Sequence, residues 1–365
     1  MKRSAISGAP KKKLKAIKKD PIEEYKTYIN KKGNGIVEVL DFSNDDCLAN
    51  VKQYISTQSI ALDSLLNGVG IPTGRVTEIY GPPHIGKSTI IDHLFSSVQL
   101  IGGVPILFDS ESARDINYTK RIGVDVSKLQ CIEFKRDELY IENVMIQMYN
   151  TVEWWASNAP DIPVVIGWDA LGGTSTRDEV KKRMESEGKP AGAAKVLSEA
   201  CRLLPSKLGR TKVAIVIANH QYESFGKGKS GFGQATQKMT YGGSAVRHLA
   251  SIRINLFNLG YINYKGEHIG RQIGAFLDKN RLGNPYKKID FALISGIGID
   301  NTWSIYETLK NAKIIVVDGG WGAINIDGEV IKFQGWNGLA DKCRENPLLF
   351  NKLLSVYYAI MRKVM

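Results

Sequence analysis

Cysteine is scarce in this sequence, and the few cysteines that occur are far apart. Among 365 residues there are four, Cys47, Cys131, Cys201 and Cys343, and none belongs to a CxxC pair. Zinc sites and disulfide frameworks both need closely or regularly spaced cysteines, so neither is expected here. The cysteine content fits a protein of the reducing cytoplasm.

Long hydrophobic runs are missing as well. No apolar stretch approaches the roughly 18 residues that a membrane-spanning helix needs, and the basic N-terminal residues lack the apolar segment of a signal peptide. We therefore expect no membrane partner. The hydrophobic fraction of 43% and the charged fraction of 24% still suit one large globular core with smaller additions.

Positive charge is in excess. The chain has 49 Lys and Arg against 37 Asp and Glu, a net charge of +12. Such an excess favours a polyanionic partner, because basic side chains that bind nucleic-acid phosphates release condensed counterions. The net charge alone is also compatible with a soluble basic protein that has no polyanionic partner.

Apolar patterning predicts four regions along the chain. Residues 1–19 end in PKKKLKAIKK, which predicts a disordered basic tail, either a polyanion-binding arm or a solvated tail without a specific role. Residues 20–53 are too few to fold alone and are expected to pack on a neighbour as an oligomerisation element. Residues 54–295 predict the main core. Residues 296–365 predict a helix, a hairpin and a terminal helix, that is, a small C-terminal α+β domain.

The main core predicts an α/β fold. Its runs RVTEIY, VPILFD, PVVIGWD and VAIVIA are nearly continuous in apolar character, as in strands covered on both faces. Helical patterns lie between them, for example at 139–155, where apolar residues share one face. We expect a mostly parallel central sheet flanked by helices, with antiparallel strands near its end.

The stretch GPPHIGKST at 81–89 matches the phosphate-loop pattern G-x-x-x-x-G-K-[ST] between a strand and a helix. Glycines let backbone N–H groups close around phosphate oxygens, and the helix N-terminus adds positive potential. Lys87 would reach the β- and γ-phosphates, and the Ser88 hydroxyl would hold Mg²⁺. The predicted nucleotide-binding residues are Gly81, Pro82, Pro83, His84, Ile85, Gly86, Lys87, Ser88 and Thr89.

Two acidic residues follow predicted strands. Glu111 lies just past VPILFD, where a carboxylate can orient a water molecule for attack on the γ-phosphate. A solvated turn acid or a helix-cap partner is the alternative. Asp169 ends PVVIGWD and is placed to hold the hydration shell of Mg²⁺.

A polar pair, Asn219 and His220, ends the run VAIVIA. Open α/β sheets bind ligands at the carboxyl ends of their strands, so a side chain here could contact the γ-phosphate and report it to the following loop. A purely structural histidine is the alternative. The loop at 221–241 combines lysines, glycines and aromatics, as a loop that binds single-stranded nucleic acid does. A disordered lid is the competing explanation.

Together these motifs resemble the RecA family of homologous-recombination ATPases over about residues 50–345. The similarity runs, in the family's order, through ISTQSIALDSLLNGVGIPTGRVTEIYGPPHIGKST, FDSESARDINYTKRIGVDVSKL, SAVRHLASIRINL and DKNRLGNPYKKIDF. The resemblance implies a RecA-like P-loop ATPase core. The Asn-His pair and the following QYE are similar to the phage UvsX-like branch, which implies a phage-type member between the two branches.

The resemblance also implies roles for individual residues. Glu111 matches the catalytic carboxylate, and Asp115 and Tyr118 match the residues that contact adenine, whereas His220 stands where the bacterial family carries Gln. Lys279 and Arg281 match a basic pair that reaches the neighbouring subunit's γ-phosphate, as an arginine finger does. Segments 174–192 and 221–241 match the two DNA-binding loops. The residues expected to bind DNA are Arg177, Lys195, Arg202, Lys227, Lys229, Phe232, Lys238 and Arg247.

The implied function is that of an ATP-dependent DNA recombinase. Such a protein forms helical filaments on single-stranded DNA, with ATP and Mg²⁺ at the subunit interfaces, and exchanges strands with homologous double-stranded DNA in recombination and repair. Single-strand-binding and mediator proteins could assist it in the cytoplasm, that of a bacterial host if a phage encodes the chain. A helicase with the same ATPase core and a nucleotide-switched, polyanion-binding scaffold are the alternatives.

Overall fold

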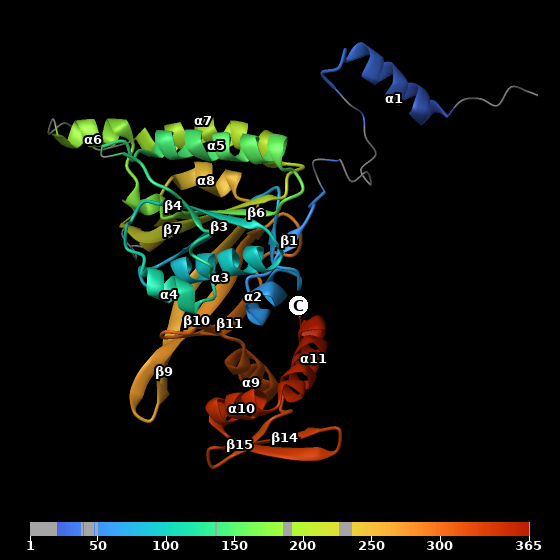
Figure 1. Ribbon diagram of the computed structural model, residues 1–365, viewed down its shortest axis with the longest axis vertical. Helices are drawn as coiled ribbons and strands as arrows, with labels where there is room; N and C mark the ends of the chain where they lie inside the picture. Colours follow the sequence, from blue (N-terminus) through green and yellow to red (C-terminus); the bar gives the residue numbers. More distant parts are fainter. Residues whose placement is uncertain are drawn as a thin grey trace, which may run out of the picture. The chain divides into compact units, whose positions relative to one another are not determined.

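The computed structural model describes residues 20–37, 39, 47, 50–135, 137–184, 192–225 and 236–364 (Figure 1). The predicted basic tail and the centre of the second predicted DNA loop lie outside these residues. The chain divides into two compact units, residues 1–50 and 51–365. The first contains helix α1 (Pro21–Lys32), which begins after Asp20, whose side chain accepts a hydrogen bond from the Ile22 N–H. No side chain of α1 is buried.

In the described part of residues 51–365, ten strands form one sheet in the order β12-β11-β10-β9-β3-β7-β6-β4-β5, with β8 paired to β7. The centre is parallel, and β9 to β12 run antiparallel to their sequence neighbours. This arrangement confirms the predicted α/β fold. The strands are β3 (Val76–Gly81), β4 (Val104–Asp109), β5 (Gln130–Ile132), β6 (Val164–Asp169), β7 (Val213–Phe225), β8 (Thr236–Thr240), β9 (Ile252–Tyr264), β10 (Glu267–Asn280), β11 (Lys288–Ile294) and β12 (Gly298–Asp300).

Helices cover both faces of this sheet, and each face has its own hydrophobic core (Figure 1). Helix α3 (Lys87–Leu100) packs Leu94 and Phe95 against one face, and α5 (Ile141–Asn158) packs Val144, Met148 and Val152 against the other. The three α5 residues recur every fourth position, which confirms the predicted helix at 139–155. The further elements are β1 (Tyr54–Ile55), α2 (Ile60–Leu65), β2 (Ile71–Pro72), α4 (Ile116–Arg121), η1 (Leu171–Gly173), α6 (Arg177–Met184), α7 (Gly192–Leu208) and α8 (Gly243–Leu249).

The C-terminal residues add a third hydrophobic cluster. Helix α9 (Asn301–Asn311) is followed by a small antiparallel sheet of β13 (Val316–Asp318), β14 (Trp321–Ile326) and β15 (Glu329–Gln334), and then by α10 (Gly335–Glu345) and α11 (Pro347–Val364). Leu309, Phe333, Leu353 and Tyr357 pack together in this cluster. The order matches the predicted helix, hairpin and terminal helix, whereas α10 was not predicted. The division of the chain at residue 296 stays a prediction.

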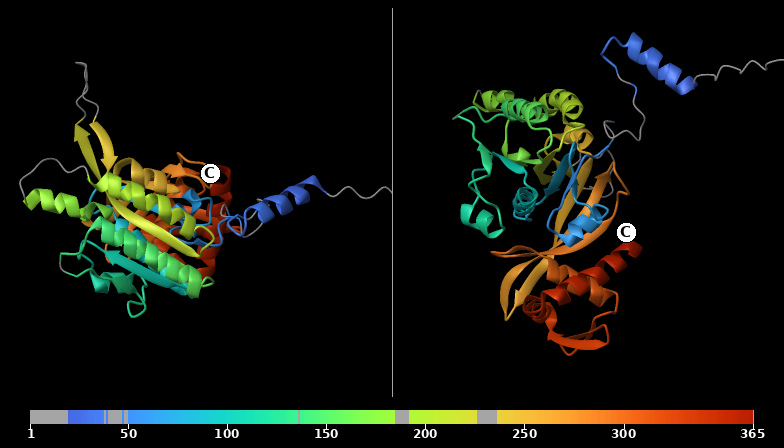
Figure 2. Two further views of the ribbon diagram at one scale, coloured as in Figure 1. Left: turned by 90° about the horizontal axis from the view of Figure 1, so that it is seen from above. Right: turned by 45° about the vertical axis from the view of Figure 1, so that its right-hand side comes forward.

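Two strand pairs extend away from the helical layers. Strands β7 and β8 pair from Gln221↔Thr240 to Phe225↔Thr236 and project as a ribbon (Figure 2). The predicted strand therefore does not end at His220 but continues into the predicted loop. Strands β9 and β10 form a long hairpin whose two turn residues, Lys265 and Gly266, have φ of 50° and 89°. Positive φ at both central residues is the requirement of a type I′ turn, which matches the twist of the paired strands.

Within the described residues, no helix is long and apolar enough to cross a membrane.

Helix α3 also buries a histidine. The Nδ1 atom of His93 lies 2.9 Å from Oε1 of Gln58, and its Nε2 accepts a hydrogen bond of 3.0 Å from the Ile299 N–H. These partners fix one neutral tautomer, with the proton on Nδ1. A second proton on Nε2 would break the contact to Ile299 and bury a positive charge.

The fold should therefore lose stability in mild acid. Burial lowers the pKa of His93 from 6.5 to about 4. Since the unfolded chain takes up this proton near its ordinary pKa and the folded chain only near 4, the contribution is complete above pH 6.5 and is lost progressively as the pH falls towards 4. The expected loss is about 3 kcal/mol in the free energy of unfolding. Urea denaturation across this pH range measures it, with His93→Gln as the comparison. An identical pH dependence in the variant would contradict the assignment.

Candidate nucleotide-binding site

The predicted phosphate loop connects the end of β3 to the start of α3 and lines a cavity of about 740 Å³. Residues 83–89 all face this cavity. Gly86 precedes α3 with φ of 95°, and a Cβ there would come within 2.1 Å of Cδ1 of Leu293, so the loop needs glycine at this position. The first turn of α3 directs N–H groups without intrahelical acceptors at the cavity, which is the arrangement that binds phosphate.

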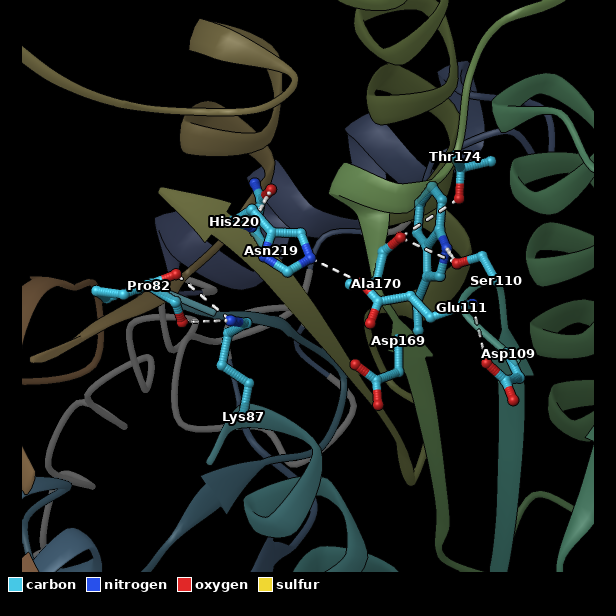
Figure 3. A network of polar contacts seen from close by, with 12 residues as sticks. Pro82, Lys87, Asp109, Ser110, Glu111, Asp169, Ala170, Thr174, Asn219 and His220 are labelled. Atoms are coloured by element: carbon cyan, nitrogen blue, oxygen red, sulfur yellow. Dashed lines mark hydrogen bonds and ion pairs between the residues drawn. The ribbon is translucent and has the colours of Figure 1, made fainter. Parts of the chain in front are cut away.

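Lys87 holds its amine across the loop. Its Nζ donates to the carbonyl of Pro82 at 2.9 Å and to that of Gly81 at 3.4 Å (Figure 3). Burial lowers the pKa of Lys87, an effect that Asp169 and Glu111 oppose. A phosphate group in the cavity would replace weak carbonyl contacts with a charge-assisted hydrogen bond.

The two predicted acids lie at adjacent strand ends. Asp109 at the end of β4 pairs in register with Asp169 at the end of β6. The Asp109 carboxylate accepts hydrogen bonds from the backbone N–H groups of Glu111 at 3.0 Å and Ser112 at 2.9 Å. This turn directs Glu111 into the cavity, which Asp169 also lines (Figure 3).

His220 contacts the predicted catalytic carboxylate directly. Its Nε2 lies 2.6 Å from Oε1 of Glu111, and the two side chains point toward one another, His220 from β7 and Glu111 from the turn after β4 (Figure 3). Both are about one-third exposed and face the cavity. Gly172 makes this approach possible, because a Cβ there would lie 2.6 Å from Cδ2 of His220. The sequence reading did not identify Gly172, although two consecutive glycines after an acidic strand end are a usable signal.

Asn219 has a different environment from its neighbour. It is fully buried, and its amide donates to Oε1 of Glu78 at 2.8 Å and to the carbonyl of Tyr241 at 2.9 Å. The Tyr241 hydroxyl in turn donates to Oε2 of Glu179, in helix α6, at 2.8 Å. Asn219 therefore does not line the cavity. It links the cavity edge to the far end of the second predicted DNA loop and to the first.

Arg114 is a site residue that sequence reasoning missed. Its Nη2 donates to Oδ2 of Asp169 at 2.8 Å, and its Nη1 contacts Asp92 in α3. All three side chains are largely buried, so the positive charge of Arg114 and the negative charges of the two carboxylates must balance one another. The predicted metal ligand Asp169 is thus already paired with an internal cation.

Asp115 and Tyr118 frame the outer part of the site. Asp115 accepts a hydrogen bond of 2.8 Å from the Asn117 N–H and so begins α4. The Tyr118 hydroxyl lies 3.3 Å from Oγ1 of Thr89, and its ring lines the cavity. Asp115 lines an adjoining cavity of about 260 Å³. Their contact with adenine stays a prediction.

The predicted basic pair lies elsewhere on the same chain. Lys279 donates to the carbonyls of Arg247 at 2.6 Å and His248 at 3.4 Å, and Arg281 donates to His248 at 3.2 Å. Burial, followed by the charges of Arg281 and Arg253, lowers the pKa of Lys279 to about 8. Lys279 and Arg247 line a separate cavity of about 490 Å³. Neither Lys279 nor Arg281 lines the phosphate cavity of its own chain.

The predicted DNA-binding residues are described only in part. Arg177 is exposed and begins helix α6. Its Nη2 forms an ion pair with Oε2 of Glu138 at 3.4 Å and donates a hydrogen bond of 2.9 Å to Oδ1 of Asn143. The first predicted loop thus contains a helix. Arg202 and Arg247 are exposed on α7 and α8. The side chains of Lys195 and Lys238 and the whole of Lys227, Lys229 and Phe232 lie outside the described residues. Their DNA contacts stay predictions.

Comparison with known proteins finds a matching family and relatives named protein RecA. The RecA N-terminal domain family matches residues 23–300. Protein RecA of Rickettsia bellii is 30% identical over 303 residues, which cover 82% of this chain and 82% of the relative. Protein RecA of Roseiflexus castenholzii is 29% identical over 303 residues, with 82% and 80% covered. Protein RecA of Oleidesulfovibrio alaskensis is 28% identical over 325 residues, with 88% and 86% covered.

Proposed function

The chain belongs to the RecA family of ATP-dependent DNA recombinases, and we propose that it acts as a helical filament on single-stranded DNA with ATP between its subunits. It is a DNA-dependent ATPase. The observation that carries the proposal is the contact between His220 and Glu111. It joins the hydrolytic carboxylate to β7, the strand that continues into the second predicted DNA loop. A polyanion-binding scaffold would need no such carboxylate.

In this proposal Glu111 orients the attacking water. The water oxygen attacks the γ-phosphorus, the bond to the leaving ADP breaks, and the water proton passes to the Glu111 carboxylate. Lys87, released from Pro82 and Gly81, neutralises the charge that develops on the phosphate oxygens. His220 holds Glu111 when ATP is absent and turns to the γ-phosphate when ATP is bound.

The site also fits Mg²⁺. The Ser88 hydroxyl and the Asp169 carboxylate line the same cavity, and oxygen ligands of these kinds suit a small hard cation. Bound there with ATP, the ion would neutralise phosphate charge. Asp169 would then divide its two oxygens between this ion and Arg114, which already holds Oδ2.

The coupling to DNA is proposed to run through Asn219. Its hydrogen bond to Tyr241, and that of Tyr241 to Glu179, connect the cavity edge with both predicted DNA loops. If β7 shifts when His220 exchanges Glu111 for the γ-phosphate, these hydrogen bonds would carry the shift to the backbone of both predicted DNA loops. The pair Asn219 and His220 also supports a phage-type member that acts in a host cytoplasm and is assisted by mediator and single-strand-binding proteins.

Helix α1 is proposed as the oligomerisation element. Its Ile22, Tyr25 and Tyr28 are all more than half exposed, and no residue of the helix is buried. Apolar side chains three or four positions apart form a face that a neighbouring subunit could cover.

Replacing His220 with alanine should uncouple ATP from DNA. Lys87 and Ser88 remain to bind ATP, and basic surface groups remain to bind DNA weakly. The gain in DNA affinity that an ATP analogue gives should fall from about fivefold or more towards none. The measurement is single-stranded DNA affinity with and without a slowly hydrolysed analogue, at fixed salt because phosphate contacts are screened. His220→Gln, whose amide can still hydrogen-bond, is the matched control and should keep most of the gain. If the parent protein binds DNA equally well with and without the ATP analogue, the proposed function itself is refuted.

A further inference from the structure

The β9–β10 hairpin reaches the nucleotide cavity from the same chain. Tyr261 on β9 and Arg271 on β10, which are paired in register, line the cavity together with His268. Nη1 of Arg271 donates a hydrogen bond of 3.1 Å to the carbonyl of His84, a residue of the phosphate loop that is 187 positions away in sequence. The hairpin is therefore attached to the loop that holds the phosphates.

The charge of Arg271 is held in place but not neutralised. Its guanidinium lies over the ring of Tyr261, 5.6 Å from the centroid, and that ring packs against His268 with centroids 4.8 Å apart. Within the described residues its contacts are thus a carbonyl and an aromatic face, not a carboxylate. An arginine fixed in this way keeps donors available for an anion, because its planar fork has five N–H groups.

The location of Arg271 indicates which anion it takes. Phosphate-loop backbone groups surround the α- and β-phosphates of a bound nucleotide, and Arg271 is hydrogen-bonded to that backbone. Lys87 is the cation on the side of the γ-phosphate. We propose that Arg271 is a second phosphate-binding cation, supplied in cis by the β9–β10 hairpin and positioned by Tyr261 and His268. The proposal rests on the proposed function, in which ATP occupies this cavity.

This role differs from that proposed for Lys279 and Arg281, which need a neighbouring subunit. Arg271 lies at the cavity of its own chain, so its contribution should be present in a single subunit without DNA. It should also be shared by ATP and ADP, because both carry the α- and β-phosphates.

The test is nucleotide affinity of the full-length protein without DNA, measured with fluorescent ATP and ADP analogues at fixed salt. Arg271→Met should weaken binding of both analogues about ten- to hundredfold, the usual effect of removing one hydrogen-bonded charge. Lys265→Met is the matched control. Lys265 lies at the turn of the same hairpin, over the ring of Tyr264, and does not line the cavity, so its loss should change neither affinity.

Two further variants separate phosphate binding from a structural role. Arg271→Lys keeps the charge without the fork and should recover part of the affinity. Tyr261→Ala should weaken binding less than Arg271→Met, whereas Tyr261→Phe should bind as the parent does. Parental affinity in Arg271→Met, with binding impaired in Lys87→Ala, would overturn the inference and leave the proposed function standing. No recovery in Arg271→Lys, together with a lowered melting temperature, would also overturn it. Absence of nucleotide binding by the parent would instead refute the proposed function.

Discussion

Replacing Lys87 with alanine should slow DNA-stimulated ATP hydrolysis about a hundred- to a thousandfold, or about 3–4 kcal/mol of barrier. The amine of Lys87 lies across the phosphate loop, 2.9 Å from the Pro82 carbonyl, and the residue is only 6% exposed. A charge in such a protected position stabilises a developing phosphate charge far more than a solvated lysine can. Among the described residues of its own chain, no other lysine lines this cavity.

Steady-state phosphate release with single-stranded DNA measures this loss. Lys120→Ala is the control, because Lys120 is an exposed residue in the last turn of α4 and its removal changes the net charge equally. That control should hydrolyse ATP at the parental rate. Turnover by Lys87→Ala within a few fold of the parent would remove the phosphate-loop assignment.

The parts of this fold that the sequence predicts are those with a local signal. The phosphate loop is nine consecutive residues, and β4, β6 and the first half of β7 are nearly continuous apolar runs, so both could be identified without distant contacts. Helix α10 was missed because its sequence, GWNGLADKCRE, contains two glycines and buries only Leu339 and Cys343. Helical periodicity needs more apolar positions than that.

The parts of the site that the sequence does not predict depend on contacts between distant residues. Arg114 lies in the loop between β4 and α4, whereas Asp92 lies in α3 and interrupts its apolar pattern without any sign of its partner. Asn219 and His220 are adjacent in a strand, so their side chains point to opposite faces, one towards Glu78 and one towards Glu111. The composition of the pair could not reveal that only one of them lines the cavity.

Replacing Lys279 and Arg281 together with alanine should leave nucleotide binding by the free protein close to that of the parent. Neither side chain lines the phosphate cavity of its own chain, and both donate to the carbonyl of His248. DNA-stimulated hydrolysis should nevertheless fall about a thousandfold, the usual contribution of a cation supplied by a neighbour. Electron microscopy with single-stranded DNA and a slowly hydrolysed ATP analogue should show helical filaments for the parent and none for the variant. Closed rings of the parent would favour a helicase instead.

Mixing this double variant with Lys87→Ala should restore hydrolysis if the pair acts across an interface. An interface with the phosphate loop of the double variant and the basic pair of the Lys87→Ala subunit contains every required group. About one interface in four has this composition in an equal random mixture, so the mixture should recover a substantial fraction of parental activity. Complementation of this kind cannot arise if Lys279 and Arg281 act within their own chain, because each subunit then carries one defect of its own. Phosphate release across a range of mixing ratios tests this, and no recovery at any ratio would refute the role of the pair between subunits.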